Sequence, residues 1–288
     1  MIPLVPPSPT SPTTPAGEPQ PSIAIVGGSI TGPALALLLH QAGFTRVSVL
    51  EASPTPYAQS GGVIGLDHVS LATLDALGIS QEELVPFPSE RVTAIHIADR
   101  RETRRSHFVH PGRNTGWHQL NTALLNRLPG GWLQPGRRVR ALRAADDGTA
   151  LLDLAGATPA RRRGRVRRRA PLPRPPPARP SRPLRYAGYV AWRGQLPGHL
   201  PGQLPDLCAF TRFEPASSQF NLFPILRKDG TTAVDWTLYL NMTSRHFRHL
   251  IGYDPTEHTY LLPHQIGTAA RTVVLAEAER LLPHRPPR

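Results

Sequence analysis

The sequence predicts an α/β protein with a βαβ unit near its N-terminal side and a strand-rich second half. Residues 22 to 52 follow the order strand, glycine-rich turn, apolar helix, strand and acid. Beyond residue 184, alternating apolar segments predict several strands, and one clear helix follows them. No segment approaches the roughly 20 apolar residues of a membrane span. The 288 residues suffice for one large domain or two modest ones.

The βαβ unit is defined by the spacing of its apolar residues and glycines. Ser22–Val26 is a β-branched apolar run that predicts a buried strand. The glycine-rich turn Gly27–Gly32 follows, and Pro33–Gln41 then has the apolar pattern of a helix that Gly43 ends. Val47–Leu50 predicts the second strand. A strand, turn, helix and strand within about 30 residues is the Rossmann-like βαβ arrangement.

The glycine-rich turn is the strongest candidate for a ligand site. A turn between a strand and a helix leaves backbone N–H groups unpaired at the positive end of the helix, where a pyrophosphate can bind. Gly27 supplies the tight turn and Gly32 allows close packing of helix on strand, while Ser29 occupies the position of the usual middle glycine. Glu51 ends the second strand, where a carboxylate accepts hydrogen bonds from ribose hydroxyls. This order predicts an adenine dinucleotide site; the alternative is a turn that uses its glycines for packing alone.

The remaining elements are predicted from periodicity, with glycine and proline as stops. Ser60–Asp67 is rich in glycine and is expected to be a loop, and Asp146–Gly148 is typical of a hairpin turn. The predicted helices are Val69–Leu77, Leu120–Leu128 and Thr268–Leu282, and the predicted strands are 91–98, Arg104–Val109, Val139–Leu142, Ala150–Leu154, Tyr186–Trp192, Gln219–Phe223 and Ala233–Leu240. An NAD-type fingerprint is usually followed by repeated βα units, so this strand-rich order favours a flavoprotein.

Two segments lack the apolar periodicity of a packed domain. Residues 1–21 form a proline-rich leader that is expected to be disordered. Residues 157–183 are expected to be an aberrant or disordered segment, because seven arginines among the nine residues Arg161–Arg169 cannot form a buried central strand. The predicted domains are therefore 22–156, which carries the dinucleotide fingerprint, and 184–288, which is rich in predicted strands.

The basicity of the chain belongs to one block. Residues 161–183 contain ten arginines and no acid, and without them the formal net charge falls from +13 to +3. A strongly basic protein favours nucleic acid or an anionic surface as its partner. Arginines without interleaved aromatic residues predict only nonspecific contact, so no specific nucleic acid and no membrane is expected as a partner.

Other classes of site are disfavoured by what the sequence lacks. The single cysteine, Cys208, forms no internal disulfide, and no signal-peptide pattern is present, so a cytoplasmic location is expected. The pairs His107/His110 and His246/His249 are not joined by a cysteine or acid set of zinc type, so no metal is expected. No Gly-x-Ser-x-Gly elbow marks a serine nucleophile. No residue is assigned a catalytic role.

Four passages carry a resemblance to a known family. They are IVGGSITG with VLEAS, SGGVIGLDHVSLATLDALGI, GRNTGWHQLNTALLNRLP and YAGYVAWRG. The sequence resembles the FAD-dependent aromatic hydroxylases of the p-hydroxybenzoate hydroxylase type, most closely their 2,6-dihydroxypyridine 3-monooxygenase branch, in which the Val-Gly-Gly-Ser form of the fingerprint is usual. The resemblance covers roughly residues 22–156 and 184–283. It implies an FAD-binding domain of the glutathione-reductase type and a β-sheet-rich substrate domain.

The resemblance also implies a set of cofactor-binding residues. The pyrophosphate of FAD would lie on the turn residues Gly27, Gly28, Ser29, Ile30, Thr31 and Gly32. Glu51 would bind the adenosine ribose, with Ala52 where relatives commonly have an arginine, and Val139 would meet the adenine through its backbone. Arg113 and Trp117 fall near a position that contacts the cofactor in relatives. The implied reaction is hydroxylation of a small aromatic or hydroxypyridine-like ring with NAD(P)H and O₂, and a homodimer is left open.

Two motifs of the family have no counterpart. Relatives carry a buried strand and Gly-Ala-Asp-Gly-x-x-Ser where this chain has its arginine and proline block. They later carry Gly-Asp-Ala-Ala, in a region that follows the last residue of the sequence given for this chain. We therefore expect a C-terminally incomplete product, in which hydroxylase activity and its loss are two outcomes to be tested. The alternatives are a NAD-dependent oxidoreductase and a non-enzymatic basic protein that binds nucleic acid through the arginine block.

The arginine and proline block leads to a hypothesis about the gene. The block has about the length of the missing passage, and its composition is what a GC-rich gene gives when read in the wrong frame. We expect residues 158–183 to be a frame-shifted translation that is restored before Leu184. Translation of the underlying DNA in the other two frames tests this. A GADGxxS-like peptide is expected in one of them, and its absence from both would overturn the hypothesis.

Overall fold

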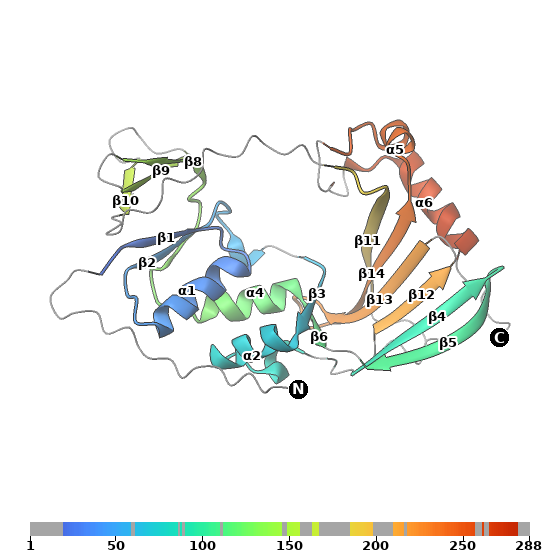
Figure 1. Ribbon diagram of the computed structural model, residues 1–288, viewed down its shortest axis with the longest axis horizontal. Helices are drawn as coiled ribbons and strands as arrows, with labels where there is room; N and C mark the ends of the chain where they lie inside the picture. Colours follow the sequence, from blue (N-terminus) through green and yellow to red (C-terminus); the bar gives the residue numbers. More distant parts are fainter. Residues whose placement is uncertain are drawn as a thin grey trace, which may run out of the picture. The chain divides into compact units, whose positions relative to one another are not determined.

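The computed structural model describes two compact units that interleave along the chain (Figure 1). The first unit contains residues 1–59 and 118–177, and the second contains residues 60–117 and 178–288. The described residues are 20–58, 61–85, 87, 90–109, 112–145, 149–155, 163–166, 185–197, 210–215, 218–256, 261 and 265–281. The predicted domain boundaries near residues 156 and 184, and nearly all of the leader 1–21, lie outside these ranges and stay predictions.

The first unit contains a short parallel sheet and helix α1. Strands β1 (Ile23–Val26), β2 (Val47–Leu50) and β7 (Leu133–Gln134) pair in the order β1-β2-β7. α1 (Thr31–Gln41) connects β1 to β2, and α4 (Trp117–Asn126) precedes β7. The predicted strand, turn, helix and strand are all present, and α1 begins two residues before the predicted Pro33.

The core of this unit lies between α1 and the sheet. Its buried side chains are Ile25, Ala36, Val47, Val49 and Trp132. The ring of Trp132 meets His40 edge-on, with the ring centroids 5.3 Å apart. Because both faces of a parallel sheet are normally covered, its strands are apolar rather than alternating, which explains the β-branched runs of β1 and β2.

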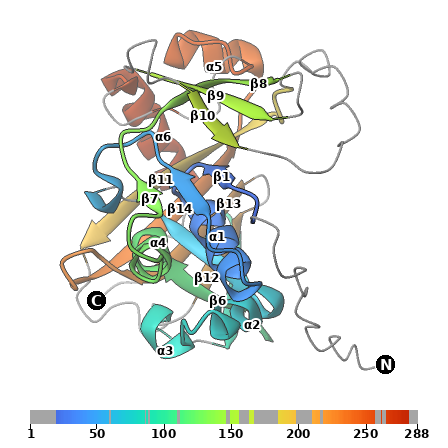
Figure 2. The same cartoon turned by 90° about the vertical axis from the view of Figure 1, so that its left-hand side faces the viewer.

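A second, antiparallel sheet of the first unit contains β8 (Val139–Ala144), β9 (Ala150–Leu154) and β10 (Arg163–Val166), in the order β10-β9-β8 (Figure 2). The predicted pairing of β8 and β9 as a hairpin is present, while the turn Asp146–Gly148 lies outside the described residues. Strand β10 lies within the segment 157–183, and the assignment of that segment as aberrant or disordered stays a prediction for its residues outside 163–166. Among the described strands β10 pairs with β9 alone, so it is an edge strand and not the buried central strand that the sequence excludes.

The second unit is built on a six-stranded sheet. Its strand order is β11-β14-β13-β12-β4-β5, and the β12/β4 pair is parallel while the other pairs are antiparallel (Figure 1). The strands are β4 (Arg91–Ala98), β5 (Arg101–Val109), β11 (Tyr189–Pro197), β12 (Phe210–Pro215), β13 (Ser218–Leu226) and β14 (Thr232–Asn241). The sequence did not predict β12, and it placed the start of β11 three residues early. Gly188 has a φ of +88°, which interrupts the extended backbone just before β11.

The two faces of this sheet differ in character. Residues paired across neighbouring strands lie on the same face. One face is apolar, because Trp192 pairs with Leu238, and these residues pack with Leu240 against α6 (Thr268–Leu281). The other face is polar and carries the paired residues Arg193 and Thr237, Gln195 and Asp235, and Arg212 and Asn221.

The polar face meets a two-stranded ribbon. β3 (Val63–Asp67) pairs with β6 (Gly112–Gly116), and β6 lies against β13. The prediction of a loop over Ser60–Asp67 is therefore wrong from Val63 onward. The physical reason is that β3 has a strand partner far away in the sequence. At Gly112 an added Cβ would lie 2.0 Å from the backbone oxygen of Leu66, so only glycine allows this approach.

The helices of the second unit begin and end with local signals. Asp67 caps α2 (His68–Ala76), because its Oδ1 accepts from the N–H of Ser70 at 2.8 Å. The hydroxyl of Thr243 accepts from His246 N–H at the start of α5, and Gly252 ends that helix with a φ of +82°. The sequence analysis did not predict α3 (Gln81–Leu84) or α5 (Ser244–Ile251).

We predict that replacing Gly194 by alanine destabilises the second unit. Gly194 on β11 faces Trp236 on β14, and an added Cβ would lie 2.6 Å from Cζ2 of the indole. Gly194→Ala is expected to lower the free energy of unfolding by roughly 1–3 kcal/mol, measured by urea denaturation. Gly65→Ala on β3 is the control, because its Cβ would approach only Asn114 Oδ1, at 3.8 Å. Equal stability of the two variants would contradict the packing argument.

Candidate functional site

The turn between β1 and α1 is closed by backbone contacts that need glycine. Gly27 has a φ of +106°, a conformation that residues with a side chain rarely adopt, and its N–H donates to Leu50 O at 2.8 Å. At Gly32 an added Cβ would lie 1.9 Å from the backbone oxygen of Gly27. Both glycines are therefore fixed by local geometry, as the fingerprint predicts.

The first turn of α1 is open toward this bend. Ile30 precedes the helix and makes no side-chain capping bond, and Ser29 and Thr31 are exposed. The first N–H groups of a helix have no partner within the helix, and the helix dipole makes this end positive. An uncapped N-terminus that follows a tight glycine turn suits a phosphate or another anion.

Glu51 lies directly beside the turn. Its Oε2 accepts from the N–H of Gly28 at 2.7 Å, and its Oε1 accepts from the N–H of Ser53 at 2.7 Å. An added Cβ at Gly28 would lie 2.9 Å from the Cβ of Glu51, so the glycine gives the acid its place. A carboxylate has about four lone-pair positions. Two remain for further donors such as ribose hydroxyls.

The sequence analysis missed Asn121, which holds the turn from the opposite side. This residue lies on α4 and is 2% exposed, and its Nδ2 donates to the backbone oxygen of Gly28 at 3.1 Å. The available signal was a polar residue among the buried positions of an amphipathic helix, next to Leu120 and Leu124. Buried amides of this kind are generally paired. Here the amide satisfies a carbonyl that the turn leaves free.

The other predicted cofactor residues fall in both units. In the first unit Ala52 follows Glu51, and Val139 is the first residue of β8; both are half-buried. In the second unit Arg113 on β6 forms an ion pair with Glu90 at 2.8 Å and donates to Gly112 O at 2.9 Å. Trp117 begins α4, and its backbone N–H donates to the backbone oxygen of Gly62 at 3.0 Å.

The polar face of the second unit contains a buried acid, Asp235. Its side chain lies beside Gln195, whose Nε2 donates to Oδ2 at 3.3 Å, and close to Arg193. Burial raises the pKa of Asp235, and the hydrogen bond from Gln195 and the charge of Arg193 oppose this rise. Among the described residues, its Oδ1 has no hydrogen-bond partner.

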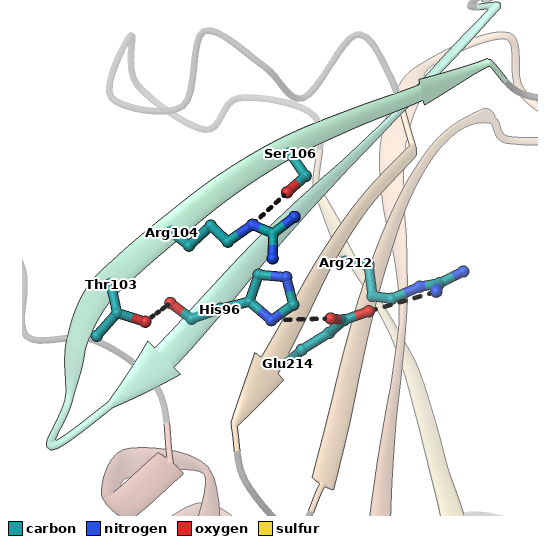
Figure 3. A network of polar contacts seen from close by, with 6 residues as sticks. All are labelled: His96, Thr103, Arg104, Ser106, Arg212 and Glu214. Atoms are coloured by element: carbon teal, nitrogen blue, oxygen red, sulfur yellow. Dashed lines mark hydrogen bonds and ion pairs between the residues drawn. The ribbon is translucent and has the colours of Figure 1, made fainter.

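A second polar cluster on this face links β4 to β12 (Figure 3). His96 Nδ1 lies 3.2 Å from Glu214 Oε2, and Arg212 Nη1 lies 3.4 Å from Glu214 Oε1. The side chains of His96 and Glu214 are about a third exposed, so each contact is expected to contribute about 1 kcal/mol or less. Of the two hydroxyls drawn there, Thr103 donates to the backbone oxygen of His96 and Ser106 accepts from Arg104, so no printed contact joins either to the imidazole, and we interpret the cluster as a cross-link between strands.

In the part of the chain that the structure describes, no group of three histidine, cysteine or acidic side chains could hold a metal ion. His246 and His249 are exposed on α5, and His107 lies 3.2 Å from the hydroxyl of Thr93, while His110 lies outside the described ranges. No described helix is both long and apolar enough to cross a bilayer.

The chain has the fold of several solved proteins, among them a hydroxylase and a protein solved with FAD, which confirms the predicted α/β class and agrees with the resemblance at the level of the fold. It resembles the 2,6-dihydroxypyridine-3-hydroxylase of Arthrobacter nicotinovorans with a TM-score of 0.68 and 20% identity, over 92% of this chain and 68% of that one. HpxO of Klebsiella pneumoniae, solved with FAD and uric acid, gives a TM-score of 0.57 and 14% identity, over 88% and 64% of the two chains.

PqsL of P. aeruginosa, solved in complex with 2-aminobenzoylacetate, is a third neighbour, with a TM-score of 0.56 and 16% identity over 88% of this chain and 70% of that one. The chain thus spans about two thirds of the length of these proteins. No protein-family model matches the sequence, and the curated proteins yield no match either.

We predict that Glu51→Gln weakens the turn even without a ligand. Glutamine keeps one acceptor oxygen but presents an NH₂ group to either Gly28 N–H or Ser53 N–H, both of which donate to Glu51. The free energy of unfolding is expected to fall by roughly 1–3 kcal/mol, because one N–H loses its acceptor. Thermal and urea denaturation measure it. Glu279→Gln, on the exposed side of α6, is the matched control, and an equal loss in both variants would contradict the argument.

Proposed function

We propose that the first unit binds FAD at Gly27–Gly32 and that the protein is an FAD-dependent monooxygenase. Its reaction would be hydroxylation of an aromatic or hydroxypyridine-like ring with NAD(P)H and O₂. The main support is the turn itself, where an uncapped helix N-terminus lies next to the carboxylate of Glu51, 2.7 Å from Gly28 N. The fold of the solved flavoproteins supports the same class.

The residues of the turn suit a dinucleotide in a specific way. The N–H groups at the start of α1 would bind the pyrophosphate, where the absence of a Cβ at Gly28 and Gly32 lets the turn close. Glu51 would accept from the ribose hydroxyls with the lone pairs that Gly28 and Ser53 leave free. Ala52 and Val139 would line the adenosine side, and Arg113 and Trp117 of the second unit are proposed as further cofactor residues.

The second unit is proposed to bind the substrate. When bound, FAD supplies the redox chemistry with O₂, so the protein needs few acids or bases of its own. The polar face of the sheet offers donors from the exposed side chains of Arg193 and Gln195, which suits a small ring that carries hydroxyl groups. These groups would orient the ring by hydrogen bonds. Trp117 and the ribbon β3/β6 would help to exclude water from that ring.

The proposed location of this activity is the cytoplasm, and the proposed substrate is a small aromatic molecule. For the oligomeric state, a homodimer is left open. HpxO is solved with uric acid, and PqsL with 2-aminobenzoylacetate, so both neighbours hold small ring-containing molecules. Because the chain spans about two thirds of the length of its neighbours, cofactor binding and hydroxylation need separate tests.

We predict that the purified full chain binds FAD and turns yellow, with absorbance at about 450 nm. Glu51→Gln is expected to weaken FAD affinity at least about tenfold, because the ribose loses a charged acceptor. Titration of the protein into FAD, followed by flavin fluorescence, measures the affinity. Glu279→Gln should bind as the wild type does. Binding of NAD(H) without FAD would favour the dehydrogenase alternative and would overturn the proposal.

We also predict ring-dependent oxidation of NAD(P)H by the FAD-loaded protein. With 2,6-dihydroxypyridine as the first probe, NAD(P)H consumption should rise, and mass spectrometry should find a product heavier by one oxygen atom. Consumption of NAD(P)H without this product would mean that the ring does not accept oxygen. FAD binding without either signal would refute hydroxylation by this chain while leaving the cofactor site in place.

A further inference from the structure

We propose that Asp235 is a positioning residue that holds the Gly61–Gly62 loop and, through this loop, Trp117. The proposal deepens the function above, because Trp117 is one of the residues assigned to FAD. Asp235 itself has no assigned role in that site. The geometry joins three parts of the second unit: strand β14, the loop that leads into β3, and the first residue of α4.

The loop packs directly on Asp235 and its neighbour on β11. An added Cβ at Gly62 would lie 3.1 Å from Asp235 Oδ2 and 3.1 Å from Arg193 Nη2. The backbone of Val63, the next residue, lies close enough to the same carboxyl group to lower its pKa. The Asp235 carboxyl thus lies beside the backbone at the point where the loop becomes strand β3.

The same loop holds Trp117 on its other side. An added Cβ at Gly61 would lie 2.7 Å from Cγ of the indole, closer than any real side chain permits. The N–H of Trp117 also donates to the backbone oxygen of Gly62, at 3.0 Å. The two glycines therefore lie between Trp117 and the Asp235 carboxyl, and a shift on one side is transmitted to the other.

Packing alone does not explain an acid at this position. Asp235 is 3% exposed, and among the described residues its Oδ1 has no hydrogen-bond partner. A buried, unpaired polar oxygen costs free energy, and a β-branched apolar residue would suit a sheet strand better. The packing of Gly62 against the Asp235 carboxyl gives the acid a role, because it holds the loop in one position.

The carboxyl group is also sensitive to its surroundings. Burial raises the pKa of Asp235, while the hydrogen bond from Gln195, the charge of Arg193 and the nearby backbone of Val63 lower it. Arg193 on β11 is the charged group that acts on it, while β13 places Phe223 opposite Asp235. The proton on this group therefore changes the charge directly under the loop.

Fluorine NMR of the full chain labelled with 5-fluorotryptophan tests the link. The four tryptophans are assigned by single Trp→Phe variants, and Trp132 of the first unit serves as the internal reference. The Trp117 resonance is expected to shift with pH above the ordinary aspartate pKa of about 3.9. Asp235→Asn should abolish this shift.

Asp229→Asn is the matched control on the turn between β13 and β14. Hydrogen bonds from Thr231 lower the pKa of Asp229, and the side chain is exposed, so the Trp117 titration should remain. A Trp117 resonance that does not titrate in the wild type, or that titrates equally in Asp235→Asn, overturns the proposal.

Denaturation gives a second readout with a defined sign. A folded-state pKa above the unfolded value means that stability is fully present below the unfolded pKa and is lost as pH rises through the folded pKa. Asp235→Asn lacks this loss, so its stability relative to the wild type should increase across that window. A difference that is constant with pH would count against the role of this carboxyl group.

The FAD measurement separates this proposal from the proposed function. Asp235→Ala should weaken FAD binding at least about tenfold, while Asp235→Asn, which keeps a side chain of the same size against Gly62, should stay within about threefold of the wild type. Circular dichroism checks that both variants fold. If the wild type binds no FAD, the proposed function fails, yet the fluorine titration still decides whether Asp235 positions Trp117. Unchanged FAD affinity in Asp235→Ala would refute the link to the cofactor.

Discussion

Close approach of backbone atoms at glycine is the constraint on which most of this structure depends. At Gly32 the helix α1 lies against the carbonyl of Gly27, at Gly112 the strand β6 lies against the carbonyl of Leu66, and at Gly194 an indole covers the backbone of β11. Protein interiors are packed too densely to absorb a misplaced methyl group. Each of these contacts therefore sets the distance between two elements, one in the first unit and two in the second.

Sequence reasoning succeeded where the signal is local. The strand β1, the turn and the strand β2 follow from a few adjacent residues, and their bounds agree with the structure to within a residue or two. It failed where pairing is distant. Nothing in Gly112–Gly116 has the alternation of a strand, and this segment is extended because β3 lies beside it. The loop predicted over Ser60–Asp67 failed for the same reason, since glycine content hid a strand whose partner is remote.

The residues of the candidate site show the same difference between local and distant contacts. The glycines and Glu51 come from one contiguous motif, so their mutual geometry was open to prediction. Asn121 reaches Gly28 from far along the chain, and Asp235 reaches the loop at Gly62 from another strand, so neither had a local pattern that named its partner. The assignment of Arg113 and Trp117 to the cofactor stays a prediction, because it comes from resemblance and not from a contact with a ligand.

The parallel pairing of β4 with β12 has a consequence for the way the protein is made. Val92 pairs with Phe210, and the whole segment 118–177 that belongs to the first unit is synthesised between them. During synthesis, β4 can pair with β5 as soon as both have left the ribosome, but the other edge of β4 must wait for β12. Contacts of such long sequence separation slow folding and leave strand edges exposed to other chains. Pairing in the middle of the sheet, where β12 joins β4 to β13, is thus complete only after β12 has been synthesised.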